Sequence, residues 1–296
     1  MAFRSCGKQT RIGLQEARSY RTSGSASTMS KKQRGRKEIT ETPGVRPATE
    51  SVPEGLDFLC EVMRIEDECE THTLERVSGL GEKAPKCREA LGTCLSLLDR
   101  AGSCWWGCSG GDHVLRYMVG RSTNIARASL RLTQMGFYDE ALALDRNLGE
   151  VANLMSLFAH DAETLIEWKK ADEAKRRNQF SPVKVRLALQ KISTPIFINE
   201  VRYSRLSSLS THVTPSTVPQ SHNPFRLPVL SSTFQDAGFL LCLNELALPV
   251  VFICFSVAHI FDLDKDVRVK ILHAGRELVE ATGGVTIDRV SQLFQT

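Results

Sequence analysis

Hydrophobic and polar positions follow a helical period over most of the chain, most clearly from His113 to Trp168. Gly136 separates two such patterns and suits the left-handed end of a helix. The stretch therefore predicts two long antiparallel helices, about 113–135 and 139–168, the second capped by Asp139. Their apolar and small positions recur every three or four residues: Leu115, Met118, Val119, Ser122, Ile125, Ala126, Ser129 and Leu132, then Leu142, Leu144, Leu148, Val151, Ala152, Met155 and Phe158.

The same period continues on both sides of this pair, and no stretch sustains the two-residue alternation of a β-strand. Ser181 and Pro182 are typical of a helix start, and Pro249 is expected to break or kink the helix that contains it. The predicted fold class is an all-α helical bundle. Its further helices are expected at about 54–78, 86–100, 182–190, 197–210, 237–261 and 267–281.

The first 53 residues differ in composition from the rest of the chain. They are rich in Ser, Thr, Arg, Lys and Gly and carry few large apolar side chains, which predicts a disordered tail. The basic run 31–37 is either a solvated segment or one that touches nucleic acid or directs localisation. We expect the helical domain to span 54–285 and a short tail to follow at 286–296.

The segment 237–261 is apolar enough to raise the question of a membrane span. Asn244 and Glu245 lie within it, and its uninterrupted apolar part is short, so we expect a buried core helix and no membrane. Nine cysteines, an odd number, follow no secretory signal. Reduced thiols in a cytoplasmic protein are the expected state, with Cys242 and Cys254 buried.

Several large enzyme classes lack their signature here. The sequence has no Gly-rich phosphate loop, dinucleotide fingerprint, His-Glu-x-x-His or Gly-x-Ser-x-Gly motif, so we expect no cofactor and no nucleotide cofactor in particular. Cys104, Cys108 and His113 form part of a zinc pattern. Structural zinc requires four ligands, so we expect no metal site and interpret these thiols as packing groups.

The net charge of +4 lies largely in the first fifty residues. The helical part is left with little excess charge, which argues against a protein that coats nucleic acid along its whole surface.

Three polar residues interrupt the apolar positions of the second central helix. Arg146 and Glu150 are four residues apart and share a face, and Asn153 follows one turn later. They are either an exposed ion pair of small energetic value or a polar cluster that faces a cleft between helices. We treat them as candidate binding residues.

Arg205 and His212 are seven residues apart, which on a continuous helix returns to nearly the same face about 10 Å along the axis. An arginine and a histidine so placed can bind a phosphate and move a proton during RNA cleavage. The alternative is a histidine favoured at a helix C-terminus by the dipole, beside an unrelated surface arginine.

Two stretches together resemble a family of bacterial helical proteins that is grouped with the HEPN (higher eukaryotes and prokaryotes nucleotide-binding) superfamily. The first is 127–168, with Gly136-Phe137-Tyr138-Asp139-Glu140-Ala141 and Arg146-x3-Glu150. The second is Tyr203-x2-Leu206-Ser207-x4-His212. The resemblance covers about 112–247.

The resemblance implies a helical bundle, often dimeric, and in many members a toxin or phage-defence ribonuclease with an Arg-x4-6-His motif. Arg205 and His212 fit that motif at its upper limit, but Leu206 stands where a polar residue is usual. We therefore expect a non-catalytic HEPN-like binding or regulatory module. The alternative is a metal-independent ribonuclease in which Arg205 binds the phosphate, His212 moves the proton and Tyr203 positions the substrate. A homodimer and RNA are the expected partners.

Overall fold

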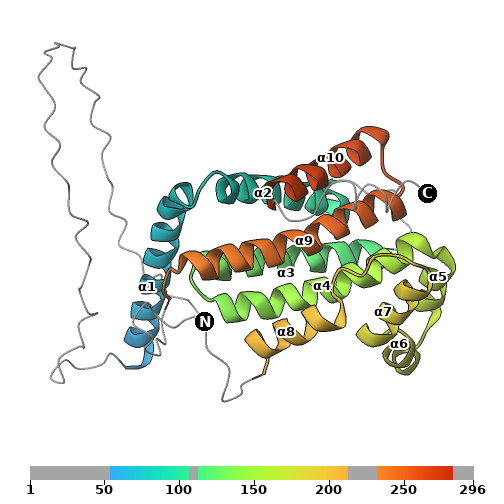
Figure 1. Cartoon of the computed structure of the whole chain (residues 1–296), viewed down its shortest axis with the longest axis horizontal. Coiled ribbons are helices and arrows are strands. Elements are labelled where there is room, and N and C mark those ends of the chain that lie inside the picture. Colours follow the sequence, from blue (N-terminus) through green and yellow to red (C-terminus); the bar gives the residue numbers. More distant parts are fainter. Residues whose placement is uncertain (1–53, 107–112, 213–231, 283–296) are drawn as a thin grey trace, which may run out of the picture. The chain divides into compact units, whose positions relative to one another are not determined.

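The computed structural model describes residues 54–106, 113–212 and 232–282, all within one unit of the chain, residues 47–296. These residues form helices and turns without any strand, which confirms the all-α prediction (Figure 1). The predicted tails 1–53 and 286–296 lie outside the described residues. The α-helices are α1 Gly55–Arg76, α2 Lys83–Gly102, α3 Val114–Gln134, α4 Tyr138–His160, α5 Ala162–Lys170, α6 Glu173–Gln179, α7 Pro182–Lys191, α8 Glu200–Ser210, α9 Asp236–Ile260 and α10 Lys265–Thr282.

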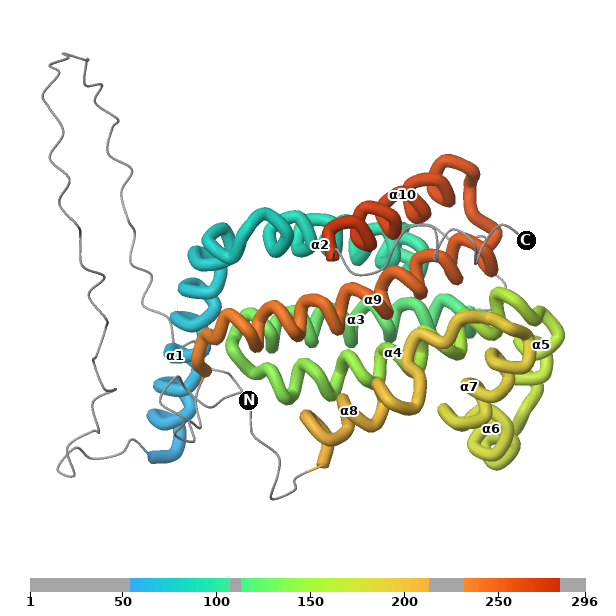
Figure 2. Tube along the Cα trace, in the orientation of Figure 1, coloured from blue at the N-terminus to red at the C-terminus, as the bar shows by residue number. Residues whose placement is uncertain are grey.

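Helices α3 and α4 form the predicted antiparallel pair (Figures 1 and 2). Gly136 has φ +82°. The amides of Phe137 and Gly136 donate to the carbonyls of Leu132 and Thr133 at 2.9 and 3.3 Å, which is a Schellman end. A Cβ at Gly136 would also lie 2.8 Å from the backbone of Thr233. Glycine is therefore required here by both conformation and space.

Two predictions about the second helix of this pair are wrong. α4 begins at Tyr138, with Phe137 in the cap position, so Asp139 lies in the first turn and is not the cap. α4 ends at His160 rather than at residue 168 because Asp161 adopts an extended conformation. The Asp161 carboxylate accepts from the Thr164 amide at 3.0 Å and thereby starts α5.

The core is organised around α9, which contacts α2, α3, α4 and α10 (Figure 1). Its apolar side chains point to all sides because neighbouring helices surround it. The helix continues past Pro249 as one element, so the predicted break does not occur, although proline leaves the Glu245 carbonyl without its usual helical donor. Fully buried side chains of α9 include Phe239, Leu243, Leu246, Val250, Ile253 and Val257.

By length and composition, α9 is the one described helix that could cross a membrane. Of its most apolar window, 72% is buried inside the protein. The prediction of a buried core helix is thus confirmed, as is the burial of Cys242 and Cys254.

The helix expected from residue 197 begins instead at Glu200. The Asn199 side chain caps it by accepting from the Arg202 amide at 2.9 Å. Phe197 and Ile198 precede the cap as a non-helical segment that packs into the core. This segment brings α8 against α4.

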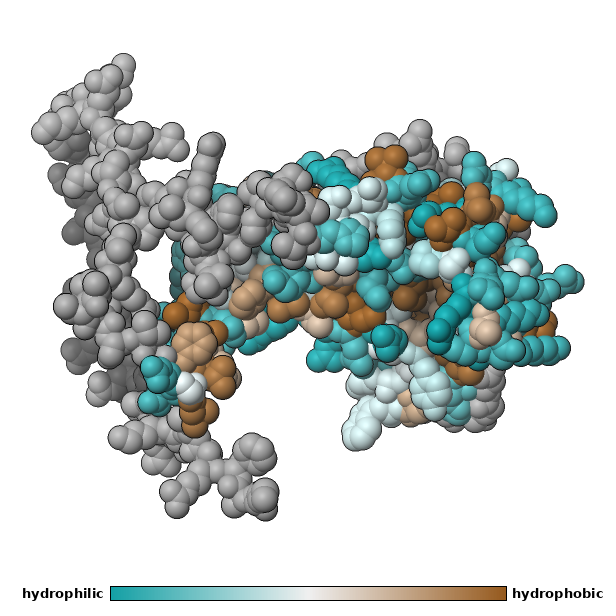
Figure 3. All heavy atoms as spheres, turned by 90° about the horizontal axis from the view of Figure 1, so that it is seen from below, coloured by the Kyte–Doolittle hydropathy of each residue, from teal (hydrophilic) through white to brown (hydrophobic). Residues whose placement is uncertain are grey.

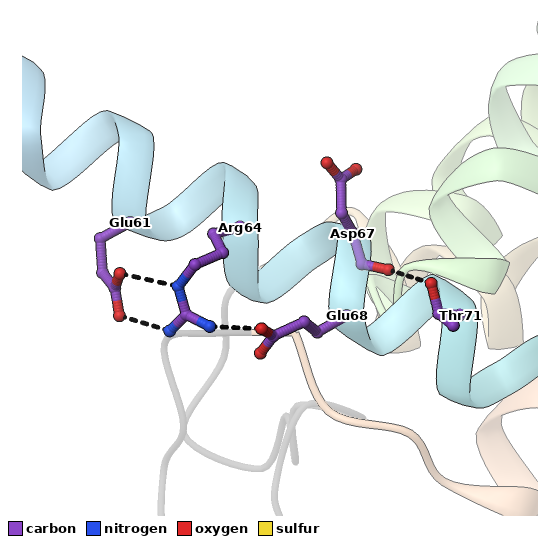
Figure 4. Close-up of polar contacts among 5 residues, drawn as sticks. All are labelled: Glu61, Arg64, Asp67, Glu68 and Thr71. Atoms are coloured by element: carbon purple, nitrogen blue, oxygen red, sulfur yellow. Dashed lines mark hydrogen bonds and ion pairs between the residues drawn. The ribbon is translucent and has the colours of Figure 1, made fainter. Parts of the chain in front are cut away.

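Helix α1 packs on the other helices only near its C-terminal end, where Cys69 and Thr73 are buried. Its first turns expose large apolar side chains, seen in Figure 3 at the end of the molecule where α1 lies. On the same helix Arg64 donates to Glu61 at 2.7 and 3.0 Å and to Glu68 (Figure 4). The exposed apolar residues are Leu56, Phe58, Leu59 and Met63.

Candidate functional site

Arg146 of α4 lies at the centre of a polar cluster between α4 and α8. Its Nη2 donates to Glu150 Oε1 at 3.1 Å and to the Tyr203 hydroxyl, and its Nη1 donates to Thr211 Oγ1 at 3.3 Å. The Arg146 and Glu150 side chains are 20% and 23% exposed. The structure thus brings together three of the residues predicted from the sequence, in a half-buried setting rather than as an exposed ion pair.

The Tyr203 ring lies against two guanidinium groups. The Cζ atoms of Arg146 and Arg186 are 4.3 and 5.1 Å from its centroid, distances typical of cation–π contacts. Arg186 comes from α7, and sequence reasoning missed it. No spacing rule links it to Tyr203, because the contact depends on how α7 and α8 both pack on α4.

The electrostatic balance of this cluster is set by burial. Loss of solvent raises the pKa of the Glu150 carboxyl, and the nearby Arg146 and Arg186 partly oppose that rise. Two guanidinium groups share this single carboxylate. Arg146 Nε and Arg186 Nη1 are buried and have no hydrogen-bond partner among the described residues. The cluster is therefore a tightly held cationic junction, enclosed by the packing of three helices.

Asn153 does not belong to this cluster. Its Oδ1 accepts from the amides of Phe197 and Ile198 at 2.9 and 3.3 Å, and its Nδ2 donates to the Ile198 carbonyl at 3.0 Å. These bonds satisfy the backbone of the buried segment before α8. The side chain of Asn153, predicted as a binding residue, thus forms three hydrogen bonds to the backbone in a structural role.

Arg205 and His212 do not form the predicted helical pair. α8 ends at Ser210, and the amides of Thr211 and His212 both donate to the Ser207 carbonyl at 2.9 Å. His212 therefore follows the helix end, and the seven-residue spacing of a continuous helix does not apply to it. Arg205 and His212 are both exposed.

A second polar group, also missed from the sequence, joins α8 to α9. Arg202 donates to Glu245 Oε2 from Nε at 2.9 Å and from Nη2 at 2.6 Å. Its guanidinium also lies 4.7 Å from the centroid of Phe197. The carboxylate that interrupts the apolar pattern of α9 is thus explained by a partner 43 residues away.

Asp145, next to Arg146 in sequence, contacts α3, whereas Arg146 contacts α8. Ser129 Oγ of α3 donates to its Oδ1, while its Oδ2 is buried without a partner in the part of the chain that the structure describes. Burial raises the pKa of this carboxyl well above its ordinary value, and Glu245 adds to the rise. Burial therefore favours the protonated form of Asp145 in the folded protein.

No group of three or more His, Cys, Asp or Glu side chains within 54–106, 113–212 and 232–282 has the geometry of a metal site. Cys104 is exposed, and Cys108 lies outside the described residues. Cys87 and Cys94, the two cysteines that precede this pattern in the chain, are buried in α2. Burial raises the pKa of Cys87 to about 12, which favours the neutral thiol over a metal-binding thiolate.

Comparison of the chain with protein-family models, with curated proteins and with solved structures finds no match. The arrangement of the residues described above is therefore the basis for a functional proposal.

Proposed function

We propose that the helical domain is a non-catalytic, HEPN-like binding or regulatory module. The observation that carries this proposal is the contrast between two sets of residues on α8. Tyr203 is held by Arg146 and Arg186, so it contributes to the register of α8 on α4. Arg205 is exposed on α8, and His212 is exposed just after the end of this helix.

Catalysis of RNA cleavage depends on donors and bases held in fixed positions around a phosphate. In the non-catalytic interpretation the polar residues of α4 and α8 instead stabilise one arrangement of the helices. A fixed arrangement of helices favours recognition of a partner, because the protein then loses less conformational entropy when it binds.

The test is a metal-free cleavage assay on a generic RNA, with wild-type protein, His212→Ala and Arg205→Ala. We expect no cleavage above the protein-free blank by any of the three, and unchanged helicity by circular dichroism. Cleavage by the wild type that falls by orders of magnitude in His212→Ala, at an unchanged melting temperature, would establish the ribonuclease alternative.

A homodimer is part of the same proposal, since the resemblance implies a two-fold assembly. The exposed apolar side chains of α1, among them Leu56, Leu59 and Met63, support it as a surface that association can bury. Light scattering at micromolar concentration should give twice the chain mass. A monomer under these conditions would contradict this part of the proposal.

A further inference from the structure

Helix α3 has an unusual charge distribution. It carries four arginines and no acidic residue over its 21 residues. At 100° per residue, the four fall within about 140° of arc, so they share one face. Arg131, at the C-terminal end, pairs with Glu70 at 2.8 Å and Asp67 at 3.6 Å of α1. The other three arginines are Arg116, Arg121 and Arg127.

These three arginines have no carboxylate partner in the described ranges. Arg116 donates from Nη1 to the Ala101 carbonyl at 3.2 Å, which fixes its guanidinium at the end of α2. Arg121 and Arg127 are exposed and form no hydrogen bond or ion pair with the described residues. Most other arginines discussed above are paired, so this face presents an uncompensated row of cations about 16 Å long.

The row borders a groove of about 720 Å³ along α3. Arg116, Tyr117, Arg121 and Asn124 line it, and no lining residue in the described chain is acidic. Gly102 and Gly120 lie where α2 and α3 approach most closely: a Cβ on Gly102 would be 3.0 Å from the Gly120 amide nitrogen. The absence of a side chain at Gly102 allows this close approach of the two helices.

Tyr117 adds a second kind of group to this groove. Its side chain is 73% exposed, which leaves an aromatic face available to a flat ligand. Asn124, about two helical turns further along, is exposed and offers both a donor and an acceptor. Cations beside an exposed aromatic ring are the combination that binds unpaired nucleotides, because phosphates pair with guanidinium groups and bases stack on the ring.

We propose that this groove on α3 binds single-stranded nucleic acid, with Arg121 and Arg127 on the phosphates and Tyr117 stacked on a base. The charge is local to one helix face, which is compatible with the small net charge of the whole chain. A duplex hides the faces of its bases, so it lacks the stacking contribution. The proposal uses none of the residues in the Arg146 cluster and is independent of whether the chain is HEPN-like.

The first experiment measures fluorescence anisotropy of labelled oligouridylate and oligothymidylate of about 12 nucleotides with the full-length protein. We expect the affinity of the wild type to fall as the salt concentration rises. The double variant Arg121→Gln with Arg127→Gln should bind about tenfold more weakly. The slope of log affinity against log salt concentration should become smaller by about one for each arginine removed. The matched control changes two exposed arginines elsewhere, Arg177→Gln with Arg276→Gln. An equal loss of affinity in both double variants would overturn the assignment of the binding site to α3.

Two further variants separate stacking from charge. Tyr117→Phe keeps the ring and should bind like the wild type, whereas Tyr117→Ala should bind several-fold more weakly. Unchanged binding in Tyr117→Ala, or equal affinity for a duplex of the same length, would overturn single-stranded recognition in favour of a polyanion surface. Comparing the affinities for the oligouridylate and oligothymidylate probes identifies whether RNA or DNA is preferred.

Hydrogen–deuterium exchange then locates the bound strand on the full-length protein. We expect oligouridylate to slow exchange in peptides covering 114–128. Slowing confined to the basic run 31–37 would overturn the groove as the site. Failure of these measurements leaves the cleavage assay on His212 unaffected, so the two proposals fail separately.

Discussion

Arg64 in α1 and Arg146 in α4 contact similar groups in different surroundings. Arg64 pairs with Glu61 and Glu68 on its own helix, and its side chain is 53% exposed (Figure 4). Arg146 pairs with Glu150 on its own helix, but it also bonds Tyr203 of α8 and Thr211 just after the end of α8, and its side chain is 20% exposed. One set of contacts is local and solvated, and the other ties two helices together.

The difference shows which polar residues of this protein determine its fold. Ion pairs within an exposed helix contribute little, because water and salt screen them and the side chains lose rotational freedom. Polar contacts between helices replace water that packing has removed, so loss of one partner leaves the other buried and unsatisfied. Asn153, Arg146 and Asp145 belong to the second group, and Arg64 belongs to the first.

The largest expected effect is that of Asn153→Ala. The substitution removes three hydrogen bonds and leaves the amides of Phe197 and Ile198 buried without acceptors. We expect a loss of about 2–4 kcal/mol in the free energy of unfolding, measured by urea denaturation. Asn178→Ala, at an exposed position in α6, is the control and should change little. A loss equal to that of the control would contradict the structural role of Asn153.

The next effect is that of Arg146→Met, which keeps much of the side-chain volume but removes the guanidinium. Glu150 and the Tyr203 hydroxyl then lose their common donor. We expect a loss of about 1–3 kcal/mol, together with faster hydrogen exchange in α8. If α8 kept its exchange rates, the cluster would not be what holds that helix on α4.

The helices and their packing face could be predicted because local pattern determines them. Apolar positions every three or four residues place α3, α4 and α9, and Gly136 ends α3 as its conformation requires. The end of α4 was missed although a signal exists: Asp161 followed by Thr164 is a capping pattern. α6 was missed because its residues are mainly charged or polar, so no apolar period marks it.

The candidate site could be predicted only in part. Arg146 and Glu150 are four residues apart, so their pairing follows from helical geometry. Arg186 and Arg202 reach their partners, Tyr203 and Glu245, only through the packing of separate helices, which no local pattern encodes. The helical spacing expected for Arg205 and His212 is not observed, because α8 ends at Ser210, two residues before the histidine.

Asp145 gives a smaller effect that depends on pH. Its pKa is higher in the folded protein than in the unfolded chain, so the folded state binds its proton more tightly. The stabilisation is fully present below the unfolded pKa, about 3.9, and is lost as pH rises through the folded pKa. In Asp145→Asn this loss cannot occur.

We expect the variant to gain stability relative to wild type as pH rises, measured by urea denaturation from about pH 4 to about pH 8. A difference that stays constant with pH would contradict a raised pKa of Asp145 in the folded protein.

The smallest expected effect is that of Arg64→Met, the counterpart of Arg146→Met. Two glutamates on α1 lose a partner, but both remain next to solvent and neither holds another helix. Glu61 and Glu68 attract the guanidinium and raise the pKa of Arg64 further above its already high ordinary value, so it is charged at any accessible pH and its pairing causes no pH dependence near neutrality. The melting temperature should stay within experimental error of wild type, and added salt should not alter the comparison. A loss as large as that of Arg146→Met would mean that α1 is held by these ion pairs, and the distinction between local and cross-helix contacts would then fail for this protein.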